Sequence, residues 1–168
     1  NIRGFASHSA ELTARLRLMP HRPTTILLNE TFLTRAIEDV QIEGYALIKR
    51  RDRGDGRAGG GVAVFARDDQ ESAVTHVASS DEDERIWVLL HGDQGPVLVC
   101  NWYRPPGESY CPSIERFAEE LCEHRSLGMA CIVTGDVNVH HQRWLQHSSH
   151  TSAAGRQLKA ICDHLGLR

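Results

Sequence analysis

Seven short apolar runs, each with the length and composition of a β-strand, constrain the fold of this chain more than any other feature. They are rich in Val, Ile, Thr and aromatic residues and are bounded by turn-forming Gly, Pro, Asn, Asp and Ser. The runs cover residues 24–29, 45–49, 61–66, 72–77, 85–91, 96–102 and 129–134. The first and last are continuously apolar and predict buried strands, whereas the middle runs follow one another closely and predict an antiparallel sheet.

Three other segments place apolar residues at helical spacing. We expect helices around residues 12–19, 114–122 and 158–165, of which the second has the clearest stripe. The expected capping residues are Ser7 or Ser9 for the first helix and Thr151 or Ser152 for the last. Because the strands outnumber the helices and the helices lie between them, the predicted class is α+β, with helices covering two packed sheets.

The composition is that of an ordinary folded domain. The chain has 168 residues, of which 40% are hydrophobic and 24% charged, so we expect a single domain over residues 1–168. No apolar run approaches the roughly 18 residues of a membrane span, and no signal peptide or membrane partner is expected. Five cysteines without a Cys-x-x-Cys pair indicate reduced thiols in an intracellular protein of the nucleus or cytoplasm, not a secreted one.

The formal net charge of −3 means that any binding of nucleic acid has to depend on local clusters. One cluster is rich in arginine and lies in the predicted hairpin loop after residue 49. It comprises Lys49, Arg50, Arg51, Arg53 and Arg57. Arg51 and Arg53 are candidates for contact with the DNA backbone, but a solvated loop interrupted by Asp52 and Asp55 is equally compatible with the pattern.

Two further clusters of polar residues have weaker implications. The acidic run at residues 81–84 does not match a calcium loop and is expected to be a solvated turn. Four histidines follow the last strand-like run: His140, His141, His147 and His150. They lack the regular spacing of a zinc site, so we expect them to support the neighbouring loop through hydrogen bonds, with His141 as a candidate substrate-binding residue.

The tetrapeptide Gly135-Asp136-Val137-Asn138 follows the last strand-like run directly. If the backbone stays extended, Asp136 and Asn138 point to the same side. A carboxylate can orient or deprotonate water, and a neutral amide can donate to a phosphate oxygen without charge repulsion. The pair therefore suits attack on a phosphodiester, although an Asp-Asn turn without function would look the same.

Two other strand-like runs end in polar side chains in the same way. Glu30 follows the first run and could hold a hard cation, although it could also be a helix-start glutamate. Tyr103 and Arg104 follow the sixth run, just before two prolines, and both can bind phosphate; core packing is the alternative for Tyr103. Because sites form where strand ends converge, we predict that Glu30, Tyr103 and Asp136 share one site, with Asn101 and Arg104 as substrate-binding residues.

Five motifs occur in the order in which the endonuclease/exonuclease/phosphatase superfamily has them. They are Asn1, Asn29-Glu30-Thr31, Gly59-Gly60-Gly61-Val62, Asn101-Trp102-Tyr103-Arg104-Pro105-Pro106 and Gly135-Asp136-Val137-Asn138. The chain thus resembles that superfamily over nearly its whole length. Asn138-Val139-His140-His141 with Trp144 is similar to a stretch of the apurinic-endonuclease-like domain of non-LTR retrotransposons.

This resemblance implies a fold, a reaction and a set of roles. The fold would be a four-layer sandwich of two mixed β-sheets flanked by helices. Glu30 would bind Mg²⁺ or Mn²⁺, Asp136 would align or activate the attacking water, and Asn1 would support the site. Tyr103 and Asn138 would hydrogen-bond the scissile phosphate. The expected activity is metal-dependent nicking of DNA, with a reverse transcriptase domain in the same full-length polypeptide.

The chain also departs from the family pattern. Asn29 and Val137 replace the more common Gln and Phe, which changes little. The family's later Ser-Asp-His motif has no counterpart after Asn138, and no strand precedes Asn1, so we expect a partial domain that is incomplete at both ends. Asp163-His164 is not a substitute, because it lies on the exposed side of the last predicted helix.

Two alternatives to a DNA-nicking enzyme remain at this point. The chain could be a non-catalytic, truncated remnant of the domain, since the histidine half of the family's site is missing. It could also be a phosphoesterase of the same superfamily that acts on inositol phosphates or lipids. The histidine pair and the Tyr103-Arg104-Pro105-Pro106 segment favour the endonuclease by resemblance.

Overall fold

The computed structural model describes residues 1–54, 59–107, 111–126 and 128–167. Each expected strand and helix is present, with its ends moved by a few residues, and one short 3-10 helix, η1, is added. The order is α1 (Phe5–Leu18), β1 (Thr25–Asn29), β2 (Tyr45–Arg51), β3 (Val62–Arg67), η1 (Asp68–Ala73), β4 (Val74–Ser79), β5 (Glu84–Gly92), β6 (Gly95–Tyr103), α2 (Pro112–His124), β7 (Ala130–Asp136) and α3 (Ala153–His164).

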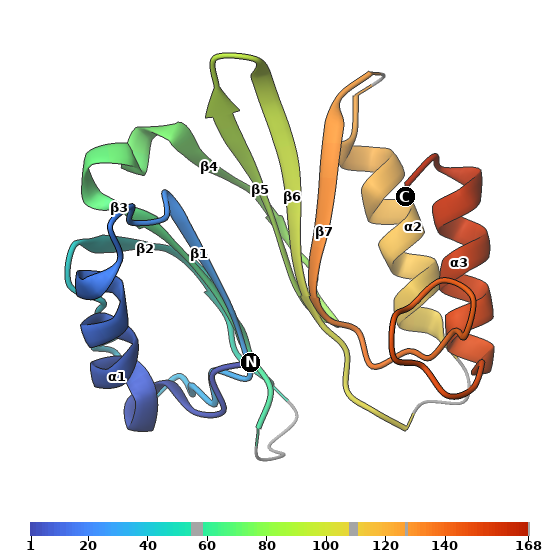
Figure 1. Ribbon diagram of the computed structural model, residues 1–168, viewed down its shortest axis with the longest axis horizontal. Helices are drawn as coiled ribbons and strands as arrows, with labels where there is room; N and C mark the ends of the chain where they lie inside the picture. The colour runs from blue at the N-terminus through green and yellow to red at the C-terminus, as the bar shows by residue number, and fades with distance from the viewer. Residues whose placement is uncertain (55–58, 108–110, 127, 168) are drawn as a thin grey trace.

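The elements form four layers (Figure 1). Helix α1 covers a three-stranded sheet of order β1-β3-β2, and α2 and α3 cover a four-stranded sheet of order β4-β5-β6-β7. The two sheets face each other between the helices. The predicted α+β class, with two sheets flanked by helices, is confirmed. The described strands make only the second sheet mixed, because β6 and β7 are parallel and the other pairs are antiparallel.

Alternating side chains of the central strands fill the spaces between the layers. In β3, Val62 and Val64 join the core between the sheets, whereas Phe65 joins the core beneath α1 and stacks on Phe5 with ring centroids 5.9 Å apart. This alternation follows from the two-residue period of a strand. Because β3 is covered on both faces, all of its residues except Arg67 are buried.

The core beneath α2 and α3 is built around aromatic rings. Trp102 of β6 stacks on Phe117 of α2 at 4.8 Å, and Trp87 of β5 stacks on the same ring at 5.9 Å. The next residue of β6, Tyr103, points to the opposite face and joins the core between the sheets. The strand period therefore turns Tyr103 away from the helices and toward the first sheet.

The helix ends were predicted with mixed success. Ser152 caps α3 and accepts a 3.0 Å hydrogen bond from the Gly155 amide, as expected. The predicted caps of the first helix are wrong, since α1 begins at Phe5 after Gly4 and contains Ser7 and Ser9. Tertiary contact sets this start, because the Gly4 and Phe5 amides donate to backbone oxygens that follow β1. No described helix has both the length and the apolar character needed to cross a bilayer.

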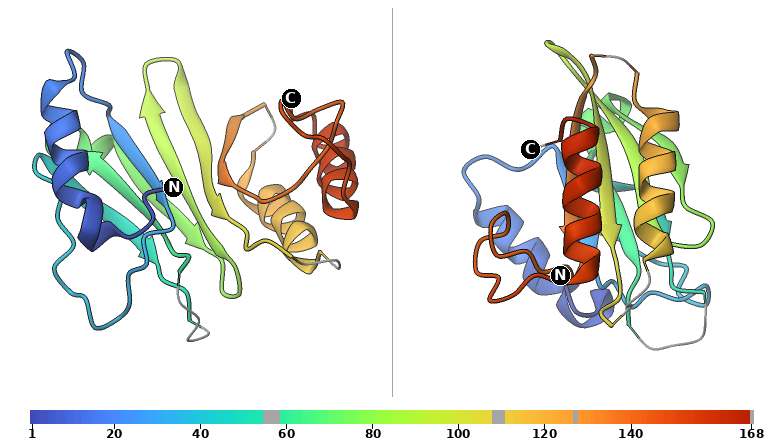
Figure 2. Two further views of the ribbon diagram at one scale, coloured as in Figure 1. Left: turned by 60° about the horizontal axis from the view of Figure 1, so that its bottom comes forward. Right: turned by 90° about the vertical axis from the view of Figure 1, so that its right-hand side faces the viewer.

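Strand β7 differs from the buried strand that its sequence predicted. It lies at the end of the sheet order and pairs with β6, and Ile132 on it is 53% exposed. Figure 2 shows the strand at the margin of its sheet. Its apolar composition reflects one face that packs against the helices, where Cys131 and Val133 join the core. An apolar run alone therefore did not distinguish a central strand from an edge strand.

Only part of the acidic segment before β5 is the solvated turn that we expected, because Asp81 and Glu82 are exposed whereas Asp83 and Glu84 are not. Asp83 accepts hydrogen bonds from Arg85 at 3.0 Å and from Arg116 at 2.8 Å. Glu84 begins β5, is 8% exposed and binds Arg53. Arg116 for Asp83 and Arg53 for Glu84 are partners far along the chain, which the local sequence does not indicate.

Candidate active site

Glu30 stands directly after β1 in a backbone conformation that side chains other than glycine seldom adopt. Its φ is +57°, and that of Phe32 is +54°. The segment is held on both sides, because the Gly4 amide donates to the Glu30 oxygen at 2.9 Å and the Phe32 amide donates to the Gly60 oxygen at 2.9 Å. Such strain persists only where neighbours impose it. The Glu30 side chain is 18% exposed and lies 3.9 Å from Arg3.

Asn1 connects the ends of the two sheets. Its side-chain amide donates a 2.8 Å hydrogen bond to Oδ2 of Asp136, the last residue of β7. The next residue, Ile2, donates its backbone amide to the Asn29 oxygen at 2.8 Å, beside Glu30. Two carboxylates that are 106 positions apart are thus brought to one edge of the molecule.

Asn138 continues the site beyond β7. Its φ is +46°, and its backbone amide donates to Oδ1 of Asp136 at 3.2 Å. The side-chain nitrogen of Asn138 donates to the Arg104 backbone oxygen at 2.7 Å. An amide nitrogen carries two hydrogens, so the second hydrogen can be donated to a substrate. We expected an extended backbone with the side chains of Asp136 and Asn138 on the same side. The structure instead has a turn, closed by the hydrogen bond from the Asn138 amide to the Asp136 carboxylate.

Tyr103 lies beside Asp136, because the two residues are paired in the parallel register of β6 and β7. The tyrosine is 7% exposed. Burial raises the pKa of its phenol, the charge of Glu30 acts in the same direction, and Arg53 opposes both. The 3.1 Å hydrogen bond from Asn101 of β6 to the Leu28 oxygen of β1 places the ends of these two strands near each other. The structure therefore brings together Asn1, Glu30, Tyr103, Asp136 and Asn138.

Asn101 and Arg104 occupy positions that differ from a substrate-binding role. Asn101 is fully buried and donates to the backbone oxygens of Leu28 at 3.1 Å and Ala63 at 3.2 Å, so it joins the two sheets. Arg104 is 1% exposed and donates to the Asn138 oxygen at 3.3 Å. Both side chains are too buried to meet a substrate and support the site from behind.

The predicted basic cluster is largely engaged within the protein. Arg51 hydrogen-bonds to the backbone oxygens of Asp81 and Asp83. Arg53 forms a 2.6 Å ion pair with Glu84. Arg57 lies outside the described residues. Contact of Arg51 or Arg53 with DNA stays a prediction, since donors already bound within the protein are less available to phosphate.

The histidines after β7 do not converge on a metal. The rings of His140 and His150 lie 4.3 Å apart, and His141 meets Trp144 edge-on at 6.3 Å. Among the residues described by the structure, no three His, Cys, Asp or Glu side chains are placed to share an ion. A structural zinc site needs about four such ligands. A magnesium site needs only one or two carboxylates with water and phosphate, which Glu30 and its surroundings fit.

Two features of the site were missed in the sequence. The side-chain nitrogen of Asn29 is buried without a hydrogen-bond partner among the described residues. The Asn29 nitrogen would lie 3.0 Å from a Cβ added to Gly135, so it faces the backbone just before Asp136. The second feature is the ion pair of Arg53 with Glu84, next to Tyr103. An unpaired buried donor is a signal that sequence alone does not give.

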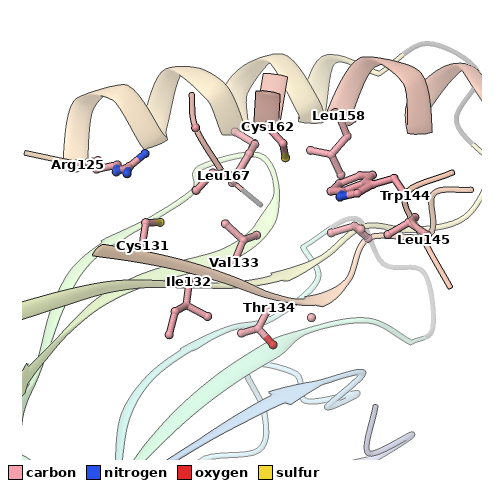
Figure 3. Close-up of a pocket in the computed structure, with 14 residues that line it drawn as sticks. Arg125, Cys131, Ile132, Val133, Thr134, Trp144, Leu145, Leu158, Cys162 and Leu167 are labelled. Atoms are coloured by element: carbon pink, nitrogen blue, oxygen red, sulfur yellow. The ribbon is translucent and has the colours of Figure 1, made fainter. Parts of the chain in front are cut away.

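One apolar cavity lies on the helix-covered face of β7 and reaches Gly135 and Val137, on either side of Asp136. It has a volume of about 570 Å³ and is lined by β7, α2, α3 and the loop between β7 and α3. Figure 3 shows Cys131 and Val133 pointing toward the helices, whereas Ile132 and Thr134 point to the other face of β7. Its walls carry few charges, and hydrolysis of a phosphodiester needs polar groups. The strand ends are the better candidate site.

Comparison with known proteins relates the fold to that of nucleases. Residues 97–168 match a family model described as endonuclease-reverse transcriptase. No curated protein sequence matches the chain. Among solved structures, the endonuclease domain of TRAS1, a telomere-specific non-LTR retrotransposon, superposes with a TM-score of 0.63 at 17% identity, over 99% of this chain and 66% of that one. The chain has the endonuclease/exonuclease/phosphatase fold.

Two further structures share the endonuclease/exonuclease/phosphatase fold with this chain. An AP endonuclease from Archaeoglobus fulgidus gives a TM-score of 0.67 at 18% identity, over 98% of this chain and 68% of that one. A 3'-5' exonuclease from Neisseria meningitidis gives 0.59 at 16% identity, over 97% and 68%. The chain therefore has a nuclease-like fold and spans about two thirds of the length of each of these proteins. The family model includes Tyr103, Asp136 and Asn138 but begins after Asn1 and Glu30.

Proposed function

We propose that this chain is a metal-dependent, DNA-nicking endonuclease domain of a retrotransposon. The observation that carries the proposal is the hydrogen bond from Asn1 to Asp136, because it joins the end of β7 to the segment beside Glu30. Two carboxylates and two phosphate-binding groups then share one edge of the sandwich. The endonuclease/exonuclease/phosphatase fold and the partial family match support the assignment.

In this proposal Asp136 receives the proton of the attacking water. Its carboxylate accepts hydrogen bonds from Asn1 and from the Asn138 backbone, one on each oxygen. Each oxygen has a further lone pair, so the group is oriented and can still accept a proton. The water oxygen forms a bond to phosphorus, and the phosphorus–oxygen bond opposite to it breaks. The leaving oxygen departs with one end of the cut strand.

The remaining residues bind the phosphate. Tyr103 and Asn138 donate hydrogen bonds to its non-bridging oxygens, where negative charge grows in the transition state. Glu30 would hold Mg²⁺ or Mn²⁺. Such a cation supplies charge that stabilises the pentavalent phosphorus. Asn1 keeps Asp136 in line with this arrangement.

The same comparisons support the proposed setting. The matching family model is described as endonuclease-reverse transcriptase, and the TRAS1 domain belongs to a retrotransposon. We propose DNA as the substrate and a reverse transcriptase domain in the same polypeptide. Such an enzyme would act inside the cell, in the nucleus or in the cytoplasm.

A plasmid-nicking assay tests the proposal. Supercoiled DNA is incubated with Mg²⁺ and either this chain or the longest natural polypeptide that contains it. EDTA and the Glu30→Ala variant should each abolish the relaxed product. Glu38→Ala is the matched control, because Glu38 is exposed and lies outside the site. Nicking that survives both EDTA and Glu30→Ala would overturn the proposal.

The same preparation separates the two alternatives. Release of phosphate from an inositol phosphate, without nicking of DNA, would identify a phosphatase. The absence of any hydrolysis, from the longer polypeptide as well, would identify a non-catalytic remnant. Either result contradicts a DNA-nicking enzyme.

A further inference from the structure

The ring of Tyr103 is held by a group outside the set of residues that we assign to the reaction. The guanidinium carbon of Arg53, just beyond the end of β2, lies 5.7 Å from the centre of the tyrosine ring. The positive charge of Arg53 also lowers the pKa of the Tyr103 phenol, against the larger effect of burial. Arginine only donates, so Arg53 cannot accept the phenol hydrogen. The phenol hydrogen is therefore left for another acceptor.

Glu84 fixes Arg53 in this position. Nε of Arg53 donates to Oε1 of Glu84 at 2.6 Å, and the two side chains are only 11% and 10% exposed. Glu84 is also the residue directly opposite Tyr103 in the register of β5 and β6. Because the carboxylate neutralises the guanidinium, Arg53 is placed to orient the phenol and not to bind phosphate with a full free charge.

The same ion pair supports the glycine segment opposite it. The Gly61 amide donates to Oε2 of Glu84. A Cβ added to Gly60 would lie 2.4 Å from that oxygen and 2.6 Å from the guanidinium carbon of Arg53. The oxygens of Gly60 and Gly61 in turn accept the backbone amides of Phe32 and Thr31, next to Glu30. The ion pair of Arg53 and Glu84 therefore contacts two parts of the proposed site. One is Tyr103, which would bind phosphate, and the other is the glycine segment that holds the backbone next to Glu30, which would bind the metal.

We propose that Arg53 and Glu84 are positioning residues that direct the phenol hydrogen of Tyr103 toward the scissile phosphate. This inference depends on the proposed hydrolytic function. It explains why a buried ion pair, which usually adds little net stability, stands at the end of the catalytic strands. Burial and the charge of Glu30 keep the pKa of Tyr103 above its ordinary value, so the phenol keeps its hydrogen at neutral pH.

A double-mutant cycle of nicking rates tests whether Arg53 acts through the phenol. Arg53→Met should lower kcat by about 10- to 100-fold, the usual range for groups that orient an active side chain, with little change in KM. In the Tyr103→Phe background the same substitution should change kcat by less than about threefold. Equal losses in both backgrounds would overturn the proposal. Arg53→Lys, which keeps the charge, should recover part of the rate.

A titration of the tyrosine ring tests the contact without any need for activity. The chain has three tyrosines, and Tyr103→Phe identifies the relevant signal in a ¹³C-tyrosine NMR spectrum. Arg53→Met should raise the pKa of Tyr103 further, because a nearby positive charge that lowers it is lost. An unchanged pKa would overturn the proposal.

A matched control comes from the first sheet. Burial raises the pKa of Tyr45, and the charge of Arg67, which pairs with Asp69, opposes this rise. Arg67→Met should therefore raise the pKa of Tyr45 and leave that of Tyr103 unchanged. If no form of the protein nicks DNA but Arg53→Met moves the Tyr103 pKa as expected, the proposed function fails and the positioning contact stands. If the protein nicks DNA and the cycle is additive, only the positioning proposal fails.

Discussion

Gly135 leaves no space for a side chain against Trp102. A Cβ added to Gly135 would lie 2.0 Å from the backbone oxygen of Trp102, and the φ of Gly135 is +125°. We expect Gly135→Ala to lower the free energy of unfolding by at least about 3 kcal/mol, since overpacking and backbone strain add together. Urea denaturation followed by circular dichroism measures this change.

Gly95→Ala is the control that separates strain from steric clash. Gly95 also has a positive φ, of +101°, but no atom lies within 4 Å of its added Cβ. Its substitution should cost about 1 kcal/mol, which is the strain alone. Similar losses for the two variants would show that β6 and β7 are not as closely packed at this point as the structure indicates.

The buried ion pair of Arg85 with Glu120 predicts acid sensitivity. Arg85 is fully buried and binds both oxygens of Glu120, at 2.7 and 2.9 Å. Burial raises the pKa of Glu120, but the hydrogen bonds and charge of Arg85 outweigh it, so the net pKa is below the ordinary 4.5. Because the pKa of Glu120 is lower in the folded chain than in the unfolded chain, the ionised carboxylate stabilises the fold at pH values above 4.5. The free energy of unfolding should therefore fall as the pH drops below 4.5.

Glu120→Gln removes the titrating group and should remove part of this dependence. At neutral pH the variant should lose about 3 kcal/mol, because the buried Arg85 loses the charge of Glu120 and keeps Asp83, at 3.0 Å, as its charged partner. Below pH 4.5 the difference from the wild type should shrink. Unfolding curves at several pH values measure both effects, and a constant difference would contradict the assigned pKa direction.

Asn101 offers a test of how the two sheets are joined. Its side-chain nitrogen donates to Leu28 and Ala63 across the interface between the sheets. Asn101→Asp replaces this donor with a buried carboxylate, and we expect a loss of about 2–4 kcal/mol at pH 7. A buried Asp has a raised pKa, so the loss should diminish as the pH falls toward its ordinary value of about 3.9. A pH-independent loss would show that water reaches this position.

The strands and the main site residues could be predicted because local sequence determines them. Strand-length apolar runs fixed β1 and β6 to within a residue or two, and Glu30, Tyr103 and Asp136 follow from the ends of such runs. We inferred that these three residues lie close together because binding sites often form where the ends of strands meet. The Asn1 to Asp136 hydrogen bond then gave this inference a specific contact.

Contacts between distant segments could not be predicted. Asn101 and Arg104 looked like substrate-binding residues because they border Tyr103, but the packing of the second sheet buries them. Arg53 and Glu84 are 31 positions apart, and neither local pattern indicates the other. The same holds for the edge position of β7. Burial and pairing depend on tertiary packing, which overrides local pattern in each case.

The central claim is that the ends of β1, β6 and β7 form one hydrolytic site, in which Asp136 activates the water. The most direct measurement is the single-turnover rate of DNA nicking by Asp136→Asn in saturating Mg²⁺, with Asp163→Asn as the matched control. Asp163 is exposed on α3 and pairs with Lys159. We predict that Asp136→Asn loses at least about 100-fold in rate, whereas the control keeps the wild-type rate. Wild-type nicking by Asp136→Asn would contradict the account.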